Sequence, residues 1–587
     1  MVIRLKETFN LTYLGLFPLG RSPSGKGMGI KMAAVILSWI YLFFICLLVG
    51  TGILGLYKDK KFTIVQYLAV GIVGITVYAE FFSLVGKIGC IAHFIMLAAA
   101  FLSGYFQRKR LAGLWKEYKP VLFSWEGFFY LCFLVLIAFF TSRGTFHTDT
   151  NIYHAQAIRL YEEYGLIKGM GNLQLHFAYN SAYFAFASIF SLNWLFGQSL
   201  HTTTGFIEVV MCLYAFHGLK AFKTHKSHIA DMMRVAVLLY ALVNLTGSIS
   251  PASDYATMYF VLFIITAWCE NMENDKDLEI YCLLSAGAVF VATLKFSACL
   301  LALIVIYPAV FLVREKRWKE TGIYLGSGLV ILLPFLIRNF LISGWLLYPF
   351  NGIDLFQVEW KIPEEYLLVD ANQIKVWGRC LYDVNKIDWP ISKWFPLWWE
   401  GQERYEKMLL GAVCLGGVLL VIQWMRKLLK HKKIRWDLFT LEVVVIGCLA
   451  AWFFMAPFIR YGLAFLFAII MFAAGEWLSE EKRGLYSIIT GSLLFCILVS
   501  VSPYWDRYIT DAGVFVKQNI TQPFYLAQKD YDRAEVGSCE INGNLIYFPE
   551  NGEINDYHVF PGTCYKFMLD RSTLMGNEIK DGFKAKE

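Results

Sequence analysis

Long apolar runs separated by short polar segments recur along the chain from residue 33 to residue 503. Runs of 17 or more residues recur among them, and each of these is long enough to cross a hydrocarbon core about 30 Å thick as a helix. Strands of a membrane barrel are shorter and alternate polar with apolar residues, so the pattern predicts helices. The predicted spans are 33–56, 62–84, 88–106, 122–141, 202–219, 234–248, 254–268, 279–296, 297–313, 322–342, 408–425, 438–457, 461–478 and 485–503.

The predicted fold is an all-α polytopic membrane protein of about 13 to 15 transmembrane helices. A basic or interfacial segment, residues 1–31, precedes the helical domain 32–503, and a small extramembrane α+β domain, residues 504–587, follows it. The composition agrees, because 57% of the residues are hydrophobic and only 17% are charged, a balance that soluble domains do not show.

Turn signals predict short strands in the C-terminal domain. The dipeptides Asn542-Gly543 and Asn551-Gly552 lie beside β-prone runs such as NLIYF. Cys539 and Cys564 also lie in this domain, and whether they pair depends on an oxidising compartment and on a distance that the sequence does not give. The 13 cysteines show no metal-type spacing, so no metal site is predicted.

Basic residues in the short loops set the predicted orientation, because loops rich in Lys and Arg stay in the cytoplasm. Placing all such loops inside puts the loops 142–200 and 343–407 and the C-terminal domain outside. The apolar stretch 177–196 must then lie in the interface or re-enter rather than cross. The basic residues of segment 1–31 do not fit this orientation, because basic segments favour the cytoplasmic side and the scheme places this one outside. The basic loops contain Lys58, Lys60 and Lys61; Arg108, Lys109, Arg110, Lys116 and Lys119; Lys220, Lys223 and Lys226; Arg314, Lys316, Arg317 and Lys319; the run Arg426 to Arg435; and Lys482 and Arg483.

The outer loop 142–200 carries the first candidate residues, Asp149 and His154, close to His147. Asp149 is predicted to be catalytic, with helix capping near Asn151 as the alternative. His154 is a second catalytic candidate, although histidines are often simply packed or solvated. The adjacent pair Glu162 and Glu163 is predicted to form the solvated face of a short helix.

The outer loop 343–407 holds seven of the 18 tryptophans. Such density suits anchoring in the membrane interface or stacking on sugar rings, and anchoring is the general preference of Trp.

Ionisable residues in or beside spans cost several kcal/mol unless they are paired or face water, so each is a functional candidate. Six further candidates fall at predicted outer ends: Asp254 as an acid, and Lys295, Arg338, Asn339, Arg460 and Tyr461 as groups for phosphate binding. The alternatives are helix capping by Asp254, snorkelling of Lys295 to the interface, and anchoring or ion pairing by the two arginines.

Acids and cations at one membrane face suit transfer from an anionic lipid-linked donor. Arginine and lysine would hold the phosphate, and a carboxylate would take the proton from an attacking hydroxyl.

These residues together resemble the integral-membrane glycosyltransferases of the GT-C class, and more closely a bacterial family of uncharacterised multi-span proteins with GT-C-like features. The resemblance rests on the order of the segments DTNIYHAQAIRLYEEYGLIKGMGNL, NSAYF, SPASD, TLKFSA, IRNFLISGWLLYPF, APFIRYG and IKDGF. It implies a GT-C-like bundle, with Asp149 as base or acceptor organiser, Asp254 as the second acid, and Lys295, Arg338 and Arg460 as groups that bind polyprenyl phosphate. No second acid adjoins Asp149, because Thr150 and Asn151 follow it. The mechanism is therefore expected to be independent of metal. The expected reaction is inverting and uses no cofactor, with the lipid-linked sugar donor as substrate.

The sequence thus predicts a glycosyltransferase of the bacterial inner membrane. It would move a sugar from a polyprenyl-phosphate donor to a glycan, lipid or protein acceptor at the outer face. Membrane lipids, and no nucleic acid, are its other expected partners, since the +7 charge lies mostly in short loops between spans. Two alternatives remain: a surface-polysaccharide polymerase or ligase that depends on outer arginines, and a transporter or flippase with charges along a path through the bilayer. A purely structural membrane protein would instead have its charges scattered in space.

Overall fold

The computed structural model describes residues 34–58, 60–219, 229–274, 276–431, 433–478 and 528–586, and the structural statements below concern these residues. The predicted N-terminal segment 1–31 and the predicted span 485–503 lie outside them. So do the basic residues Lys220, Lys223, Lys226, Lys482 and Arg483.

Every predicted span that falls on described residues coincides with a helix, with ends that differ by a few residues. The protein is an all-α multi-pass membrane protein with short strands near its C-terminus. Within the described ranges nine helices are long and apolar enough to cross a membrane, or ten if the bent pair α4 and α5 forms one span. The helices at the predicted spans are α2 (Ala34–Leu54), α3 (Ile64–Ser83), α4 (Cys90–Phe106), α6 (Trp125–Arg143), α10 (Thr203–Gly218), α12 (Ile229–Asn244), α13 (Ser253–Glu273), α14 (Leu278–Leu294), η5 (Phe296–Val305) with α15 (Ile306–Arg314), α16 (Trp318–Ser343), α19 (Arg404–Leu429), α20 (Trp436–Met455) and α21 (Ile459–Leu478).

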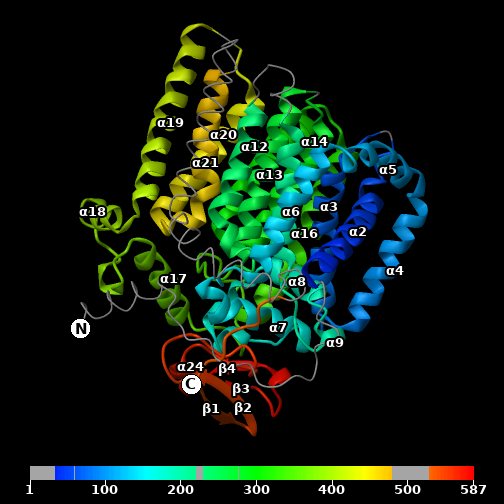
Figure 1. Ribbon diagram of the computed structural model, residues 1–587. Helices are drawn as coiled ribbons and strands as arrows, with labels where there is room; N and C mark the ends of the chain where they lie inside the picture. The colour runs from blue at the N-terminus through cyan, green and yellow to red at the C-terminus, as the bar shows by residue number, and fades with distance from the viewer. Residues whose placement is uncertain are drawn as a thin grey trace, which may run out of the picture. The chain divides into compact units, whose positions relative to one another are not determined.

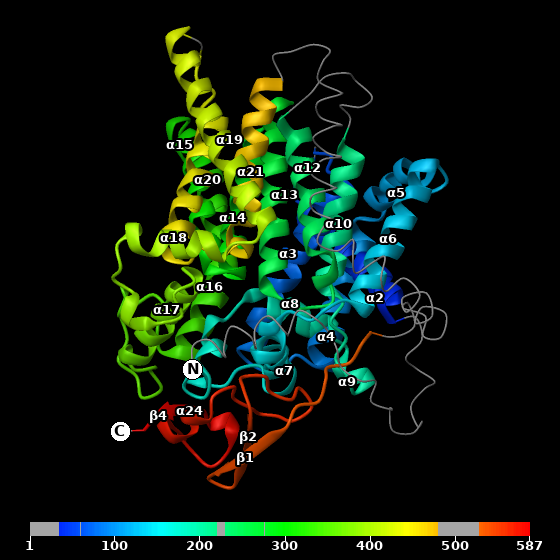
Figure 2. The same ribbon diagram turned by 60° about the vertical axis from the view of Figure 1, so that its left-hand side comes forward.

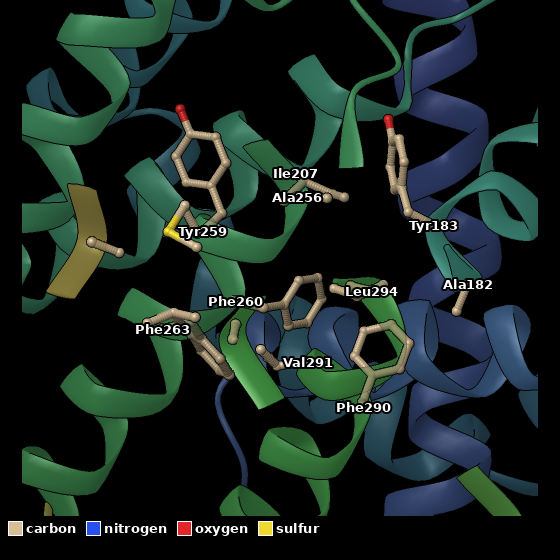
Figure 3. Packing of buried hydrophobic residues seen from close by; sticks show 14 of the residues in the cluster. Ala182, Tyr183, Ile207, Ala256, Tyr259, Phe260, Phe263, Phe290, Val291 and Leu294 are labelled. Atoms are coloured by element: carbon tan, nitrogen blue, oxygen red, sulfur yellow. The ribbon is translucent and has the colours of Figure 1, made fainter. Parts of the chain in front are cut away.

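Helix α13 lies at the centre of the helical bundle. It is apolar on all sides, as a helix surrounded by other helices must be, and it packs against α10, α12, α14 and α21. Figure 3 shows part of this core, where aromatic side chains of α13 and α14 interdigitate. The rings of Phe260 and Phe290 meet edge to face with centroids 5.2 Å apart. This packing fixes the position of the first turn of α13, which carries Asp254.

The short elements of the two long loops gather at one end of the bundle. Figures 1 and 2 both show α7, α8, α17 and the strands at the lower end, and the basic helix α5 (Arg108–Leu122) at the upper end. Helix α5 and the elements of the long loops thus lie at opposite ends of the bundle, and which end faces the cytoplasm stays a prediction. The loop elements are α7 (Ala155–Glu163), η2 (Met170–Asn172), η3 (Leu175–Tyr179), α8 (Ala182–Phe190), α9 (Asn193–Phe196), α17 (Glu364–Gly378), η6 (Val384–Lys386) and α18 (Ile391–Gly401).

The C-terminal residues form two small antiparallel sheets. Strand β1 (Val536–Ile541) pairs with β2 (Asn544–Pro549) across Asn542 and Gly543, both of which have positive φ angles. The predicted hairpin at this Asn-Gly pair is therefore confirmed. Strand β3 (Ser572–Leu574) pairs with β4 (Phe583–Ala585), and the helix α24 (Lys566–Arg571) and the turn η7 (Ile579–Asp581) complete the segment.

The C-terminal segment binds directly to the outer loop 142–200. Arg159 Nη1 donates to the carbonyl of Tyr557 at 2.7 Å, and the backbone N–H of Cys564 donates to Gln174 Oε1 at 3.0 Å. Asn172 and Gln156 bind further C-terminal carbonyls. The C-terminal segment and the helical part accordingly form one compact unit. Cys539 and Cys564 are both free thiols, so the pairing left open by the sequence does not occur here.

Two expectations about the outer loops need correction. Helix α8, within the stretch 177–196, is too short to cross a membrane, as predicted, but every one of its residues is buried by protein. It therefore packs as an internal helix on α3 and α7 rather than in the interface, and the re-entrant alternative stays a prediction. Trp194, Leu195 and Phe196 of α9, in the same stretch, are exposed. In the loop 343–407, Trp345, Trp394 and Trp398 are also buried, which leaves the other four tryptophans for contact with lipid or sugar.

Glu162 is also placed differently from the prediction. It is buried and accepts hydrogen bonds from Ser199 and Asn193, whereas its neighbour Glu163 is exposed and pairs with Arg159. The prediction of a solvated face was wrong for Glu162, because α7 has the C-terminal segment on one side and the turn before α10 on another.

Candidate functional site

Arg460 is the centre of a group of polar side chains that come from four separate parts of the chain. Its Nη2 donates to Asp149 Oδ2 at 3.0 Å, and its Nε lies 3.5 Å from Asp254 Oδ2. Its Nη1 lies 2.7 Å from His147 Nε2, and its Nη2 also donates to the hydroxyl of Tyr461 at 3.1 Å. We call the set His147, Asp149, Asp254, Lys295, Arg460 and Tyr461 the charge cluster.

Lys295 completes the charge cluster. Its ammonium group contacts Asp254 Oδ1 directly and lies 3.8 Å from the centre of the Tyr461 ring, a cation–π distance. Asp254 thus bridges both cations with its two oxygens. The cluster contains two carboxylates and two cations in direct contact.

The backbone explains how each charge reaches this place. Asp254 lies in the first turn of α13, and Arg460 in the first turn of α21. Lys295 is one extended residue between α14 and η5, so the chain reverses there and holds the lysine at the helix ends. Asp149 precedes a single π-helical turn, Thr150–His154, a local irregularity that often occurs at functional sites.

The capping and snorkelling alternatives do not describe these side chains. Asp149 makes no side-chain cap to the following turn, and Asp254 is a first-turn residue of α13, whose cap position belongs to Ala252. Lys295 is mostly buried against Asp254 rather than extended to an interface. For Arg460, ion pairing with both aspartates is what the structure shows.

The surroundings of Asp149 keep it ionised. Burial alone would raise the pKa of this carboxyl, but the positive charge of Arg460, with smaller contributions from the neighbouring histidines and Lys295, holds the pKa below its usual range. Asp149 is therefore a carboxylate at neutral pH, and the ion pair with Arg460 makes it a weak base.

His147 belongs to the charge cluster although the sequence did not rank it among the candidates. Its backbone N–H donates to Ser250 Oγ at 2.7 Å, and the backbone N–H of Asp149 points to its Nδ1 at 3.1 Å. Burial lowers the pKa of His147 to about 4, with Asp149 acting in the opposite direction. His147 is therefore neutral at pH 7, with one ring nitrogen protonated and one able to accept. It accepts either from Arg460 at Nε2 or from the backbone N–H of Asp149 at Nδ1, according to the tautomer. The sequence feature that could have identified His147 as a site residue is its position two residues before Asp149.

His154 lies beside the charge cluster as a buried, neutral ring. Its Nδ1 is 3.1 Å from Thr150 Oγ1, and its ring packs against Tyr153 and Phe184. Burial lowers the pKa of His154 well below its usual value. It makes none of the direct contacts to Arg460 that Asp149 and His147 make, so its role here is packing against their loop.

Arg338 and Asn339 do not join the charge cluster. Arg338 is buried and donates to Ser83 Oγ at 2.5 Å, to the carbonyl of Gly165 at 3.0 Å and to Asn180 Oδ1 at 3.2 Å. Asn339 donates to the carbonyl of Leu346. These protein acceptors tie α16 to α3 and to the outer loop, so the structure places both residues apart from the charge cluster. Their predicted role in phosphate binding stays a prediction.

An aromatic layer adjoins the charge cluster and contains an acid that the sequence did not single out. Asp370 of α17 is buried and accepts from the hydroxyls of Tyr179 at 3.0 Å and Tyr348 at 2.8 Å. Tyr153 connects the two groups, since its ring packs on His154 on one side and on His176 on the other. Burial raises the pKa of Asp370, opposed by His176 and by the two tyrosines. The sequence did not identify Asp370 as a candidate, because nothing in its local sequence indicates that it is buried.

Within the described ranges no group of three or more His, Cys, Asp or Glu side chains is arranged to hold a metal ion. The charge cluster itself offers two carboxylates, two cations, a neutral imidazole and a phenol.

The family model described as Domain of unknown function (DUF8201) matches residues 32–467. The chain belongs to this family. The matched range contains the whole charge cluster and ends before the C-terminal strands, so the cluster lies in the part of the chain that defines DUF8201. Comparisons with curated proteins and with solved structures give no match.

Proposed function

We propose that this protein is a membrane glycosyltransferase with a GT-C-like bundle. It transfers a sugar from a polyprenyl-phosphate donor to a glycan, lipid or protein acceptor at the outer face of the bacterial inner membrane. One observation carries the proposal: two acids and two cations from four distant parts of the chain meet where the outer loop 142–200 reaches the ends of α13, α14 and α21. Buried charges in a membrane protein are costly, and their convergence favours a chemical role.

The proposed reaction assigns a part to each charge. The acceptor hydroxyl oxygen attacks the anomeric carbon of the sugar while Asp149 takes the hydroxyl proton. The bond between the anomeric carbon and the phosphate oxygen breaks, and polyprenyl phosphate leaves with the electron pair. Arg460 and Lys295 stabilise the negative charge of this leaving group. Asp254 orients both cations through its two oxygens.

The same arrangement speaks against the alternatives. A structural protein would have its charges scattered, whereas Asp149, Asp254 and Arg460 are in contact. A flippase would place charges along a path through the bilayer, whereas these lie at helix ends. A polymerase that depends on Arg338 would need that guanidinium to be accessible, and it is buried among protein acceptors.

The test measures release of polyprenyl phosphate by protein reconstituted with polyprenyl phosphates that carry different sugars, in the presence of envelope extract as the acceptor source. We expect the wild-type protein to release polyprenyl phosphate from at least one donor. Asp149→Asn should lower the rate by roughly 10²- to 10⁴-fold, the usual contribution of a general base.

Asp532→Asn is the matched control, because Asp532 has an 81% exposed side chain outside the charge cluster and should keep full activity. Undiminished release by folded, membrane-inserted Asp149→Asn would overturn the proposal. Loss of activity in Arg338→Ala alone, at unchanged thermal stability, would favour the polymerase instead.

A further inference from the structure

The charge cluster has no spare cation for an incoming phosphate. Arg460 already contacts both aspartates, and Lys295 already contacts Asp254 and the face of Tyr461. A phosphate that binds here must therefore take a cation from a carboxylate. This competition decides which acid is released when the donor arrives.

Arg460 is the cation placed to exchange partners. Its side chain is 37% exposed, whereas that of Lys295 is 19% exposed and that of its partner Asp254 only 4%. Breaking a buried ion pair leaves an uncompensated charge, so the pair of Lys295 and Asp254, the more buried of the two, is the more costly to separate. Guanidinium also presents several donors in a plane that suits the oxygens of a phosphate.

The acid that Arg460 would release is Asp149. Arg460 reaches Asp149 through Nη2, an outer nitrogen that it shares with the hydroxyl of Tyr461, while its Nε lies toward Asp254. A rotation that turns the outer nitrogens to a phosphate therefore leaves Asp149 first. His147 and Tyr461 flank the guanidinium and limit its other orientations.

We propose that Arg460 is a latch on Asp149 that the phosphate group of the donor opens. The inference rests on the proposed function for the identity of the donor. In the absence of donor the latch holds Oδ2 of Asp149, and the positive charge of Arg460 makes the carboxylate a weaker base. When the phosphate binds, Arg460 pairs with it, and Asp149 is freed to accept a proton. The donor therefore binds before the acceptor is activated.

The latch is tested by the reactivity of Asp149 toward a hydrophobic carbodiimide, which modifies protonated carboxyl groups. Asp149 is ionised while Arg460 holds it, and it gains proton affinity when its cation leaves and an anion arrives. The full-length protein in detergent is treated at mildly acidic pH with polyprenyl phosphate, with polyprenol, or with inorganic phosphate. Peptide mass spectrometry then measures the label on Asp149, with the exposed carboxyl of Glu163 as the internal reference.

We expect polyprenyl phosphate to raise labelling of Asp149 by roughly tenfold, the effect of one pKa unit, and polyprenol to leave it unchanged. An equal rise with inorganic phosphate supports the latch and assigns recognition to the phosphate rather than to the lipid chain. Unchanged or reduced labelling with polyprenyl phosphate overturns the latch.

Variants separate the latch from general effects on the fold. In the Arg460→Gln variant, Asp149 should be labelled by the carbodiimide in the absence of lipid. The extent of labelling should equal that of the wild-type protein with polyprenyl phosphate. Arg533→Gln, a change at a 69% exposed arginine outside the charge cluster, should behave as the wild type. Labelling that responds to polyprenyl phosphate in a protein without transferase activity would retain the latch and refute the proposed function. Sugar transfer without any change in the labelling of Asp149 would retain the proposed function and refute the latch.

Discussion

Asp254 is the residue whose two oxygens hold both cations in place. It is almost completely buried, so its charge is tolerated only because Lys295 and Arg460 lie against it. Neutralising it leaves Lys295 without its partner in a protein interior. The effect on stability is therefore expected to exceed that of changing an exposed acid.

We predict that Asp254→Asn lowers the free energy of unfolding by about 3 to 5 kcal/mol, the usual cost of removing one member of a buried pair. The double variant Asp254→Asn with Lys295→Met should recover much of this loss, because no charge is left unpaired. Thermal unfolding in detergent measures both. A double variant no more stable than the single one would show that the pair is not the cause.

For individual residues, the sequence identified the charged candidates but not the side chains that they contact in the folded protein. Asp149, Asp254, Lys295 and Arg460 were recognisable because charge beside an apolar run is rare and costly. Arg338 has the same local signature, but its acceptors Ser83, Gly165 and Asn180 lie far away in the chain, so only the folded structure separates it from the others. The burial of Glu162 was hidden for the same reason, since its partner Ser199 also contacts Tyr557.

The outer loop and the C-terminal strands act as one element, and glycine makes their closest approach possible. Gly169 has a φ of +60°, and a Cβ atom there would lie 1.9 Å from the carbonyl oxygen of Phe583 in β4. The backbone N–H of Phe583 in turn donates to the carbonyl of Lys168 at 2.9 Å. A side chain at residue 169 would therefore push β4 away from the loop.

We predict that Gly169→Ala makes the C-terminal segment sensitive to protease in the otherwise folded protein. The matched control is Gly197→Ala, which has a φ of +67° and nothing within 4 Å of the added Cβ. In the control variant, the added side chain should lower stability only through the left-handed backbone conformation, by about 1 to 2 kcal/mol. Equal protease sensitivity in both variants would attribute the effect to backbone strain rather than to contact with β4.

Glu162 gives this docked element a dependence on pH. Burial raises its pKa from 4.5 to about 7, partly offset by hydrogen bonds from Ser191 and Ser199. Between pH 4.5 and about 7 the folded protein thus holds a proton that the unfolded chain has released. Raising the pH through this interval removes stability, and above about 7 Glu162 adds no further dependence.

We therefore predict that stability falls by at most roughly 1.4 kcal/mol per pH unit over this interval through Glu162. Glu162→Gln should flatten the profile, because a neutral amide replaces the titrating group. Unfolding temperature measured across the pH series, for wild-type and variant protein, provides the check. Parallel profiles for the two proteins would contradict the assignment.

At the element scale the apolar runs were sufficient to place the helices, since hydrocarbon thickness sets the length of a spanning run. The Asn-Gly hairpin followed from turn chemistry in the same way. The burial of α8 was not predictable, because an apolar helix of this length fits equally well in a membrane interface and in a protein core. Packing against α3 and α7 places α8 in the protein core and not in the membrane interface.

For the whole molecule, the sidedness rests on basic loops at one end of the bundle and the C-terminal strands at the other. We predict that Asp532→Cys reacts with a membrane-impermeant maleimide when the outer membrane is permeable and the inner membrane is intact. Lys116→Cys, an exposed site on α5, should react only after the inner membrane is opened. Labelling above that of the unsubstituted protein is the readout, and the opposite pattern would invert the proposed orientation.

The equal number of acids and cations in the charge cluster also sets the range of its electrostatic field. Opposite charges in contact cancel each other within a few ångströms, and physiological salt screens the remainder over about 8 Å. A lipid phosphate is therefore not drawn in from a distance, as an anion is by a basic groove. It arrives by lateral diffusion in the membrane and is recognised only on contact, which makes selectivity a matter of fit at Arg460 and not of attraction.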